Sequence, residues 1–260
     1  MRTFRASSWL SGVIYAFLLA PILVVIVASF NAGAFLTFPP QGLSLRWYAT
    51  FLHNEVFVQA FLTSIRIAAV ATLSSGIIGT LAALYTARAR PSVANRVRMA
   101  MMIPMLLPEV LTAIGLLFFF YALGIGLHYG VALLAGHILL TLPFIYLSVL
   151  TSLQGYDWSC DLAARSLGAG PFKTFFRITF PLIRPGVIGG CLFAFIASFD
   201  AFSTSFLLKD IGTATLPLQL FDYLRLNFTP EAAAVSSFTI FVTLLVIVVT
   251  ERLAGAKLPK

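Results

Sequence analysis

The sequence predicts an all-α integral membrane protein with six transmembrane helices, and three observations lead to this fold class. Of the 260 residues, 60% are hydrophobic and only 10% are charged, whereas a soluble domain carries about 25% charged residues. The apolar residues form long unbroken runs, which favour helices over the short alternating strands of a membrane barrel. Basic residues cluster in every second loop, as expected for a multi-pass protein.

The six predicted spans follow from the length of the apolar runs, since a helix needs about 20 apolar residues to cross the hydrocarbon core. Runs of this kind cover residues 9–31, 62–86, 99–122, 131–152, 184–208 and 233–253. The first run is too long for the apolar part of a cleaved signal peptide, so we expect it to be retained as a membrane helix. Together they predict one transmembrane domain over residues 1–260, surrounded by lipid.

The distribution of arginine and lysine predicts the orientation. Thirteen of the 17 lie in the two termini and in the loops after the second and fourth spans, and three lie in the loops on the other side. The remaining one, Arg66, lies inside the second span. The positive-inside rule therefore places both termini in the cytoplasm. It also accounts for the net charge of +8 without a nucleic-acid partner.

The long segment 153–183 follows the fourth span and is predicted to hold two short cytoplasmic helices. Asp157 is suited to cap the first helix, and Gly168 stands where a glycine commonly ends one. Pro171 can begin the second helix, which we expect to end at Pro181 before the fifth span. The apolar residues of this hairpin have few ways to be buried within it, so a groove on a partner protein is expected to cover them.

The order of residues in this segment resembles the EAA loop of ABC importer permeases. That pattern is Glu-Ala-Ala, three residues, Gly, nine residues and Ile-x-Leu-Pro, and five positions here are in register: Ala163, Ala164, Gly168, Ile178 and Pro181. Two positions depart from it. Leu162 stands at the glutamate position, with the acidic Asp161 one residue earlier, and Phe180 replaces the leucine.

The resemblance extends over the whole chain. Residues 107–115, residues 198–202 and the series Tyr15, Pro21, Ser29 to Asn31 are similar to the second permease subunit of spermidine/putrescine importers. This implies the MetI-like fold of type I importers, in a multi-pass protein of the bacterial inner membrane. It also implies a second, different permease as partner, two cytoplasmic ATPases that hold ATP and magnesium, and an extracytoplasmic solute-binding protein.

In that family the EAA helix lies in a cleft of the ATPase, so the resemblance implies that residues 157–181 form an ATPase-coupling loop. The residues assigned to it are Asp161, Ala163, Ala164, Arg165, Leu167, Gly168, Ala169, Phe172, Phe175, Ile178 and Pro181. If the motif's glutamate makes an ion pair with the ATPase, Asp161 would have to supply that charge from a displaced position.

Two carboxylates lie well inside predicted spans, away from the span limits near residue 253: Glu109 in the third span and Asp200 in the fifth. A charged side chain at the centre of a membrane helix costs about 2.5–3.5 kcal/mol on insertion scales, so such residues usually face a cavity or a partner. We expect both to line the translocation path and to attract a cationic solute such as a polyamine. For Glu109, hydration or an arginine partner near the end of its helix is the alternative. Opines, amino-acid-like compounds, phosphonates and thiamine remain alternative substrates.

Other functional classes find less support in the sequence. The chain has no Gly-x-x-x-x-Gly-Lys-Ser/Thr phosphate loop, so we expect ATP hydrolysis on a partner chain and no enzyme activity in this one. Its three histidines and two cysteines have no metal-ligand spacing. An ATP-independent carrier or channel would be expected to show inverted repeats or broken helices, and it would leave the EAA-like loop unexplained.

Overall fold

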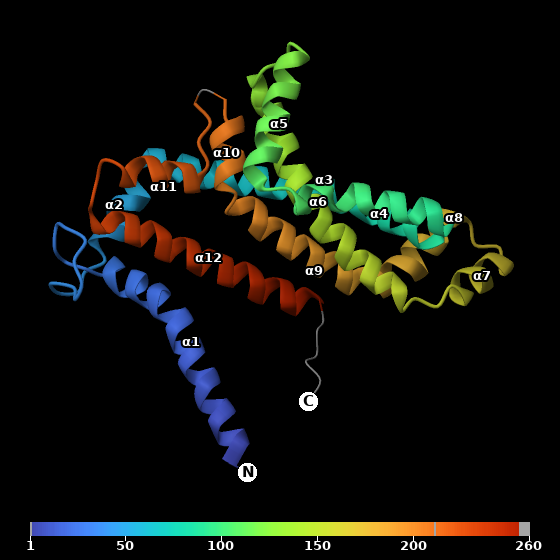
Figure 1. Ribbon diagram of the computed structural model, residues 1–260, viewed down its shortest axis with the longest axis horizontal. Helices are drawn as coiled ribbons and strands as arrows, with labels where there is room; N and C mark the ends of the chain where they lie inside the picture. Colours follow the sequence, from blue (N-terminus) through green and yellow to red (C-terminus); the bar gives the residue numbers. More distant parts are fainter. Residues whose placement is uncertain (1, 211, 255–260) are drawn as a thin grey trace. The chain divides into compact units, whose positions relative to one another are not determined.

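The computed structural model describes residues 2–210 and 212–254, which are mainly helical (Figure 1). The α-helices are α1 (Arg2–Ser29), α2 (Arg46–His53), α3 (Glu55–Arg88), α4 (Pro91–Leu106), α5 (Glu109–Ala122), α6 (Val131–Gln154), α7 (Ser159–Ser166), α8 (Pro171–Thr174), α9 (Phe180–Phe199), α10 (Phe202–Leu208), α11 (Leu216–Leu224) and α12 (Pro230–Ala254). A 3₁₀ turn, η1, covers His128–Gly130, and a π-helical turn, η2, covers Phe175–Thr179. The described residues contain no strand, so the predicted all-α fold is confirmed.

Five helical segments of the described chain are long and apolar enough to cross a membrane. They are Ser11–Ser29, Glu55–Arg88, Val131–Gln154, Pro171–Phe199 and Pro230–Arg252. A sixth span results if α4 and α5 are counted together as one bent span. These segments agree with the six predicted spans, while the side on which the termini lie stays a prediction.

Two of the predicted spans are not continuous helices. In the third, α4 ends at Leu106 and α5 begins at Glu109, and their axes differ by 104°. The cause is Pro108, because a proline disfavours helical backbone in the residue before it, and Leu107 is extended with ψ 143°. The predicted fifth span is interrupted after Phe199, where the backbone of Ala201 is also extended.

The prediction that the second loop helix ends at Pro181 is wrong. The helical run continues from Pro171 through α8, η2 and α9 to Phe199. A proline lacks the N–H that the helical ladder needs, so the hydrogen-bond pattern must adjust near it, and the π-helical turn η2 ends at Thr179, two residues before this proline. The second half of the loop is therefore continuous with a membrane helix.

Contacts divide the chain into two compact units, and residues 60–218 with 245–260 form the larger one. In it, α6 and α9 pack side by side over their length (Figure 1). Small residues allow this approach: a Cβ on Gly190 would lie 2.9 Å from the Cα of Ile145, and one on Gly186 would lie 2.7 Å from the Ser148 carbonyl oxygen. Close backbone contact of this kind is typical of membrane helices.

The smaller unit comprises residues 1–59 and 219–244. Its core contains the rings of Phe51, Phe57 and Tyr223, with centroids 5.2–6.0 Å apart in neighbouring pairs. Glu231 is buried beside them, where its carboxylate accepts hydrogen bonds from Asn54 at 3.3 Å and from the Tyr223 hydroxyl at 2.8 Å. One domain over residues 1–260 stays a prediction.

Candidate coupling loop and intramembrane carboxylates

The loop of residues 157–181 begins with a capped turn, as the sequence predicts. The Asp157 carboxylate accepts hydrogen bonds from the Ser159 backbone N–H at 2.9 Å and from the Ser159 hydroxyl at 2.8 Å. These two bonds lower the pKa of Asp157, so this exposed carboxylate stays ionised at neutral pH. Its position just before α7 lets it satisfy an N–H that has no acceptor inside the helix.

The first loop helix ends at Gly168, also as predicted. This glycine has φ +81°, in the left-handed region that other residues adopt only at a cost. The N–H of Gly168 bonds the Arg165 carbonyl at 2.9 Å, and the N–H of Ala169 bonds the Ala164 carbonyl at 3.0 Å. This pair of bonds is the Schellman arrangement, which satisfies the last carbonyls of α7 and turns the chain toward α8.

The outward face of the loop is apolar. Four large side chains are strongly exposed: Leu162 (66%), Leu167 (89%), Phe172 (79%) and Phe176 (63%). Ala163 and the cations Arg165, Lys173 and Arg177 are exposed around them. Leu162 and Phe176 are absent from the predicted set, although Leu162 occupies the glutamate position of the motif and Phe176 lies at helical spacing from Phe172. We call these four large residues the outer apolar face.

Other predicted members of the loop face inward or lie between the two environments. Ala164 is buried, and Phe175 packs against the core formed by α6, α9 and their neighbours. Ile178 and Ala169 are half-buried, and Pro181 is exposed. The expectation that Ala164 is presented to a partner is therefore wrong, because it lies on the inner side of an eight-residue helix whose other side carries Leu162.

Asp161 points into the chain and not toward the outer apolar face. It is 5% exposed, and its Oδ2 atom accepts an ion-paired hydrogen bond from Arg88 at 2.8 Å. Its Oδ1 atom accepts one from the Thr179 hydroxyl at 3.1 Å and a short one from the Tyr156 hydroxyl. With these internal partners, Asp161 does not take over the outward position of the motif's glutamate.

Aromatic contacts surround this buried carboxylate. The Arg88 guanidinium lies 4.6 Å from the centre of the Trp158 ring, and the Tyr156 and Trp158 rings meet edge to face at 4.8 Å. Burial and the bond to Asp161 raise the pKa of Tyr156, so its hydroxyl stays protonated and donates. A surface hollow beside this group is lined by Ala87, Arg88, Trp158, Asp161, Leu162 and Arg165.

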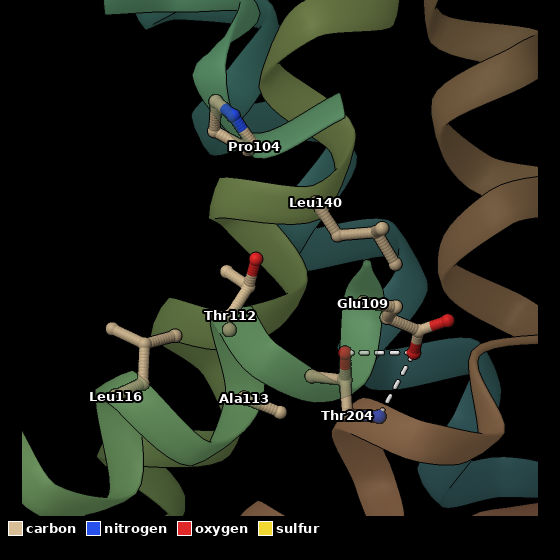
Figure 2. Close-up of a pocket in the computed structure, with 8 residues that line it drawn as sticks. Pro104, Glu109, Thr112, Ala113, Leu116, Leu140 and Thr204 are labelled. Atoms are coloured by element: carbon tan, nitrogen blue, oxygen red, sulfur yellow. Dashed lines mark hydrogen bonds between the residues drawn. The ribbon is translucent and has the colours of Figure 1, made fainter. Parts of the chain in front are cut away.

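Glu109 lies at the break of the third span, where it is the first residue of α5. Its Oε1 atom accepts hydrogen bonds from the backbone N–H and the hydroxyl of Thr204, both at 2.9 Å (Figure 2). Thr204 is buried in the first turn of α10, where backbone N–H groups have no acceptor within the helix. Glu109 thus satisfies the N-terminus of another helix, and this threonine, not an arginine, is its partner.

A small hollow adjoins this contact. It is lined by Pro104, Glu109, Thr112, Ala113, Leu116, Gly136, Leu140 and Thr204, which come from α4, α5, α6 and α10 (Figure 2). A Cβ on Gly136 would lie 2.6 Å from Leu208 and 2.7 Å from the Thr204 methyl group, so α6 and α10 approach each other closely here. Glu109 therefore joins the breaks of the third and fifth spans at a tightly packed point.

Asp200 differs from Glu109 in its surroundings. It follows the last residue of α9, and its backbone N–H bonds the Ile196 carbonyl at 3.1 Å. Its side chain is exposed, and within the described part of the chain its carboxylate has no hydrogen-bond or ion-pair partner. Of the two predicted path residues, Asp200 is the one whose carboxylate has neither oxygen bonded within the described residues, whereas the Oε1 atom of Glu109 is bonded to Thr204.

A buried polar chain near the same break was not predicted. His137, which is 1% exposed, contacts the Ser198 hydroxyl at 2.8 Å through Nδ1 and the Ser205 hydroxyl at 3.2 Å through Nε2. These two serines stand on either side of the interruption between α9 and α10. The histidine is thus a satisfied packing residue, and among the described residues no group of potential ligands could hold a metal ion.

Apolar spans with two interruptions, together with a loop that has an exposed apolar face, are features of a multi-pass membrane protein. Residues 75–257 match the family described as "Binding-protein-dependent transport system inner membrane component", and the chain belongs to this family. It is a permease subunit of an ABC importer. Its relatives are transport components and not enzymes, and the family excludes the ATP-independent carrier, although broken helices do occur.

Two relatives show how far the similarity extends. The chain is 31% identical to the spermidine/putrescine transport system permease protein PotC of Escherichia coli K12, over 94% of this chain and 92% of that protein. It is 31% identical to the putrescine transport system permease protein PotI of the same organism, over 86% and 81%. The fold matches a bacterial alginate ABC transporter in complex with alginate pentasaccharide-bound periplasmic protein, with TM-score 0.75, 16% identity and coverage of 97% and 94%.

Proposed function

We propose that the chain is one of two permease subunits of a polyamine importer in the bacterial inner membrane. The observation that carries this proposal is the equal similarity to two permeases, both named for putrescine transport, over most of the chain. A substrate with several positive charges also agrees with a free carboxylate within a predicted span. The alternative substrates named above become outcomes of the test.

Asp200 is the proposed contact for the cationic solute. Its carboxylate is exposed at the end of α9 and is not used by the described residues. A carboxylate inside a span is costly unless it faces a cavity or a partner, and a passing polyamine would be such a partner. Glu109 is proposed to support the path indirectly, because its Oε1 atom is already bonded to Thr204 and holds α10 in place.

The loop of residues 157–181 is proposed to dock on a partner ATPase. Its outer apolar face exposes four large side chains with cations around them, which suits an apolar groove with an acidic rim. The positive charge of the loops and termini supports a cytoplasmic position for this face under the positive-inside rule. The ATP and magnesium would be held by that ATPase, because this sequence contains no phosphate-binding loop.

The full assembly would contain a second, different permease, two ATPases and an extracytoplasmic solute-binding protein. The fold match to a transporter in complex with a periplasmic protein supports the last of these partners. Genes for an ATPase, a permease and a binding protein next to this one would supply the components for reconstitution.

Uptake by the reconstituted complex tests the proposal. Proteoliposomes containing the complex and ATP would be given the loaded binding protein with labelled spermidine or putrescine. We expect uptake that requires both ATP and the binding protein, and that an excess of unlabelled polyamine suppresses. Uptake of thiamine, a phosphonate or an opine in place of a polyamine would overturn the substrate proposal. Uptake without ATP would contradict the coupling mechanism.

A further inference from the structure

The feature that points beyond docking is the buried carboxylate of Asp161. α7 has eight residues, too few to be stable as an isolated helix, so it must be held by what it buries. Only Asp161 and Ala164 of this helix are buried. Ala164 contributes one methyl group, whereas Asp161 makes three hydrogen bonds, so the charged side chain is the main internal attachment of the helix.

The three partners of Asp161 belong to three different helical segments of the membrane domain. Arg88 is the last residue of α3, and Tyr156 lies two residues after the end of α6. Thr179 is the last residue of η2, inside the helical run that continues into α9. One carboxylate on α7 is therefore bonded at the same time to the end of α3, to the segment that follows α6 and to the turn that leads into α9.

The covalent connections of α7 are less suited to transmit movement. Gly155 lies in the segment that enters the helix, and Gly168 and Gly170 lie in the segment that leaves it. Glycine gives the backbone freedom to rotate, so a displacement of α7 could be absorbed at these points. The side-chain bonds of Asp161 to Arg88 and Thr179 bypass them.

We infer that Asp161 is a positioning residue that passes the movement of α7 to the end of α3, to the segment that follows α6 and to the helical run that continues into α9. This inference rests on the proposed function of the loop as the ATPase-docking element. It also explains why the acid stands one residue before the motif's glutamate position: adjacent helix positions point about 100° apart. The acid therefore faces inward to its three partners, and the leucine faces outward on the docking side.

The test measures solute transported per ATP hydrolysed by the complete complex in proteoliposomes. For Asp161→Asn we expect normal assembly, an unchanged KM for ATP, and binding-protein-stimulated hydrolysis that continues. Transport per ATP should fall by about fivefold or more. This factor is the lower end of the change that a typical coupling free energy produces. The control is Glu251→Gln, which removes an exposed carboxylate outside the coupling loop and should leave the ratio unchanged.

A double variant separates the two roles available to the acid. The double substitution Asp161→Leu with Leu162→Glu places an acid at the glutamate position of the family motif but removes the three internal bonds. We expect it to lower transport per ATP. Recovery or improvement of that ratio would show that the acid serves the docking face, and would overturn the inference.

Milder variants decide the matter if Asp161→Asn fails to assemble. Tyr156→Phe combined with Thr179→Val removes both donors to Oδ1 with little change in shape. A ratio equal to that of the wild type would then overturn the inference, and a lowered ratio would support it.

Leu162→Arg with Leu167→Arg tests docking separately. If the ATPase still assembles with that variant, the proposed function of the loop fails, whereas an effect there with none at Asp161 refutes the present inference alone.

Discussion

Replacing Glu109 by leucine should release α10 from its packed position. The variant removes the acceptor of two hydrogen bonds and leaves the Thr204 N–H without a partner in a buried site. A buried donor left unpaired costs about 1–3 kcal/mol. The Thr204 hydroxyl can rotate to suit its surroundings, whereas the backbone N–H is fixed, so we assign the cost to the N–H alone. The open state of α10 should therefore become about 5- to 150-fold more populated.

The accessibility of Leu208, the last residue of α10, reports this opening. Leu208 is fully buried, so a cysteine there should react with a maleimide only when the helix opens. The measurement needs a background in which Cys160 and Cys191 are replaced. We expect the reaction rate in the Glu109→Leu variant to rise by the same factor as the open population, about 5- to 150-fold.

Two further variants make the prediction specific. Glu109→Gln keeps an acceptor oxygen and loses only the charge, so its effect should be smaller, about 1 kcal/mol. Val110→Ala alters an exposed neighbour in the same turn and should change nothing. If Glu109→Leu left the maleimide rate at position 208 at the parent value, the hydrogen bonds to Thr204 would not hold α10, and the role assigned to Glu109 would be wrong.

Three other predictions address the path, the loop and the orientation. Asp200→Asn should lower polyamine transport in proteoliposomes by about five- to a hundredfold without affecting assembly or the binding protein, because it removes a free charge from the path; unchanged transport would remove Asp200 from the path. Gly168→Ala and Gly168→Leu should destabilise the loop equally, by about 1–2 kcal/mol from the backbone alone, because open space surrounds the Cβ position. A greater loss of ATPase co-purification with leucine would locate the docking groove at this residue. A cysteine at the exposed position Asn95 should react with a membrane-impermeant reagent only from the cytoplasm, and one at the exposed position Leu226 only from outside. The reverse pattern would refute the predicted orientation.

The helical content and the approximate limits of the spans could be predicted from the sequence, because the hydrophobic effect acts on runs of about 20 residues and tolerates small errors. The loop ends at Asp157 and Gly168 could also be predicted, since caps are local arrangements. The continuity of the run through Pro181 could not. A proline favours a helix end but allows a first turn or a π-helical adjustment, and packing decides between them.

The inward orientation of the Asp161 side chain could not be predicted from the sequence, for a different reason. Its partners Arg88 and Thr179 are 73 and 18 residues away along the chain, so no local pattern reports them. The signal that was present is the displacement of the acid by one residue from the glutamate position of the motif. Because a shift of one residue rotates a side chain to another side of a helix, an acid moved from the motif position is better interpreted as facing away from the docking surface.

The two intramembrane carboxylates lead to a more general interpretation of such residues. Glu109 begins a helix at one break and Asp200 follows the end of a helix at another. A helix end provides unpaired backbone groups and access to polar neighbours, so a carboxylate is less costly there than at the centre of an intact helix. A charge within an apolar run therefore indicates an interrupted span before it indicates a substrate contact. In this chain the break supplies the partner of Glu109, the N-terminus of α10 at Thr204, which lies 95 residues away in sequence. The break at Asp200 does not supply a partner for its carboxylate among the described residues. This difference is the physical reason for proposing Asp200 as the contact for the solute and Glu109 as a support of the path.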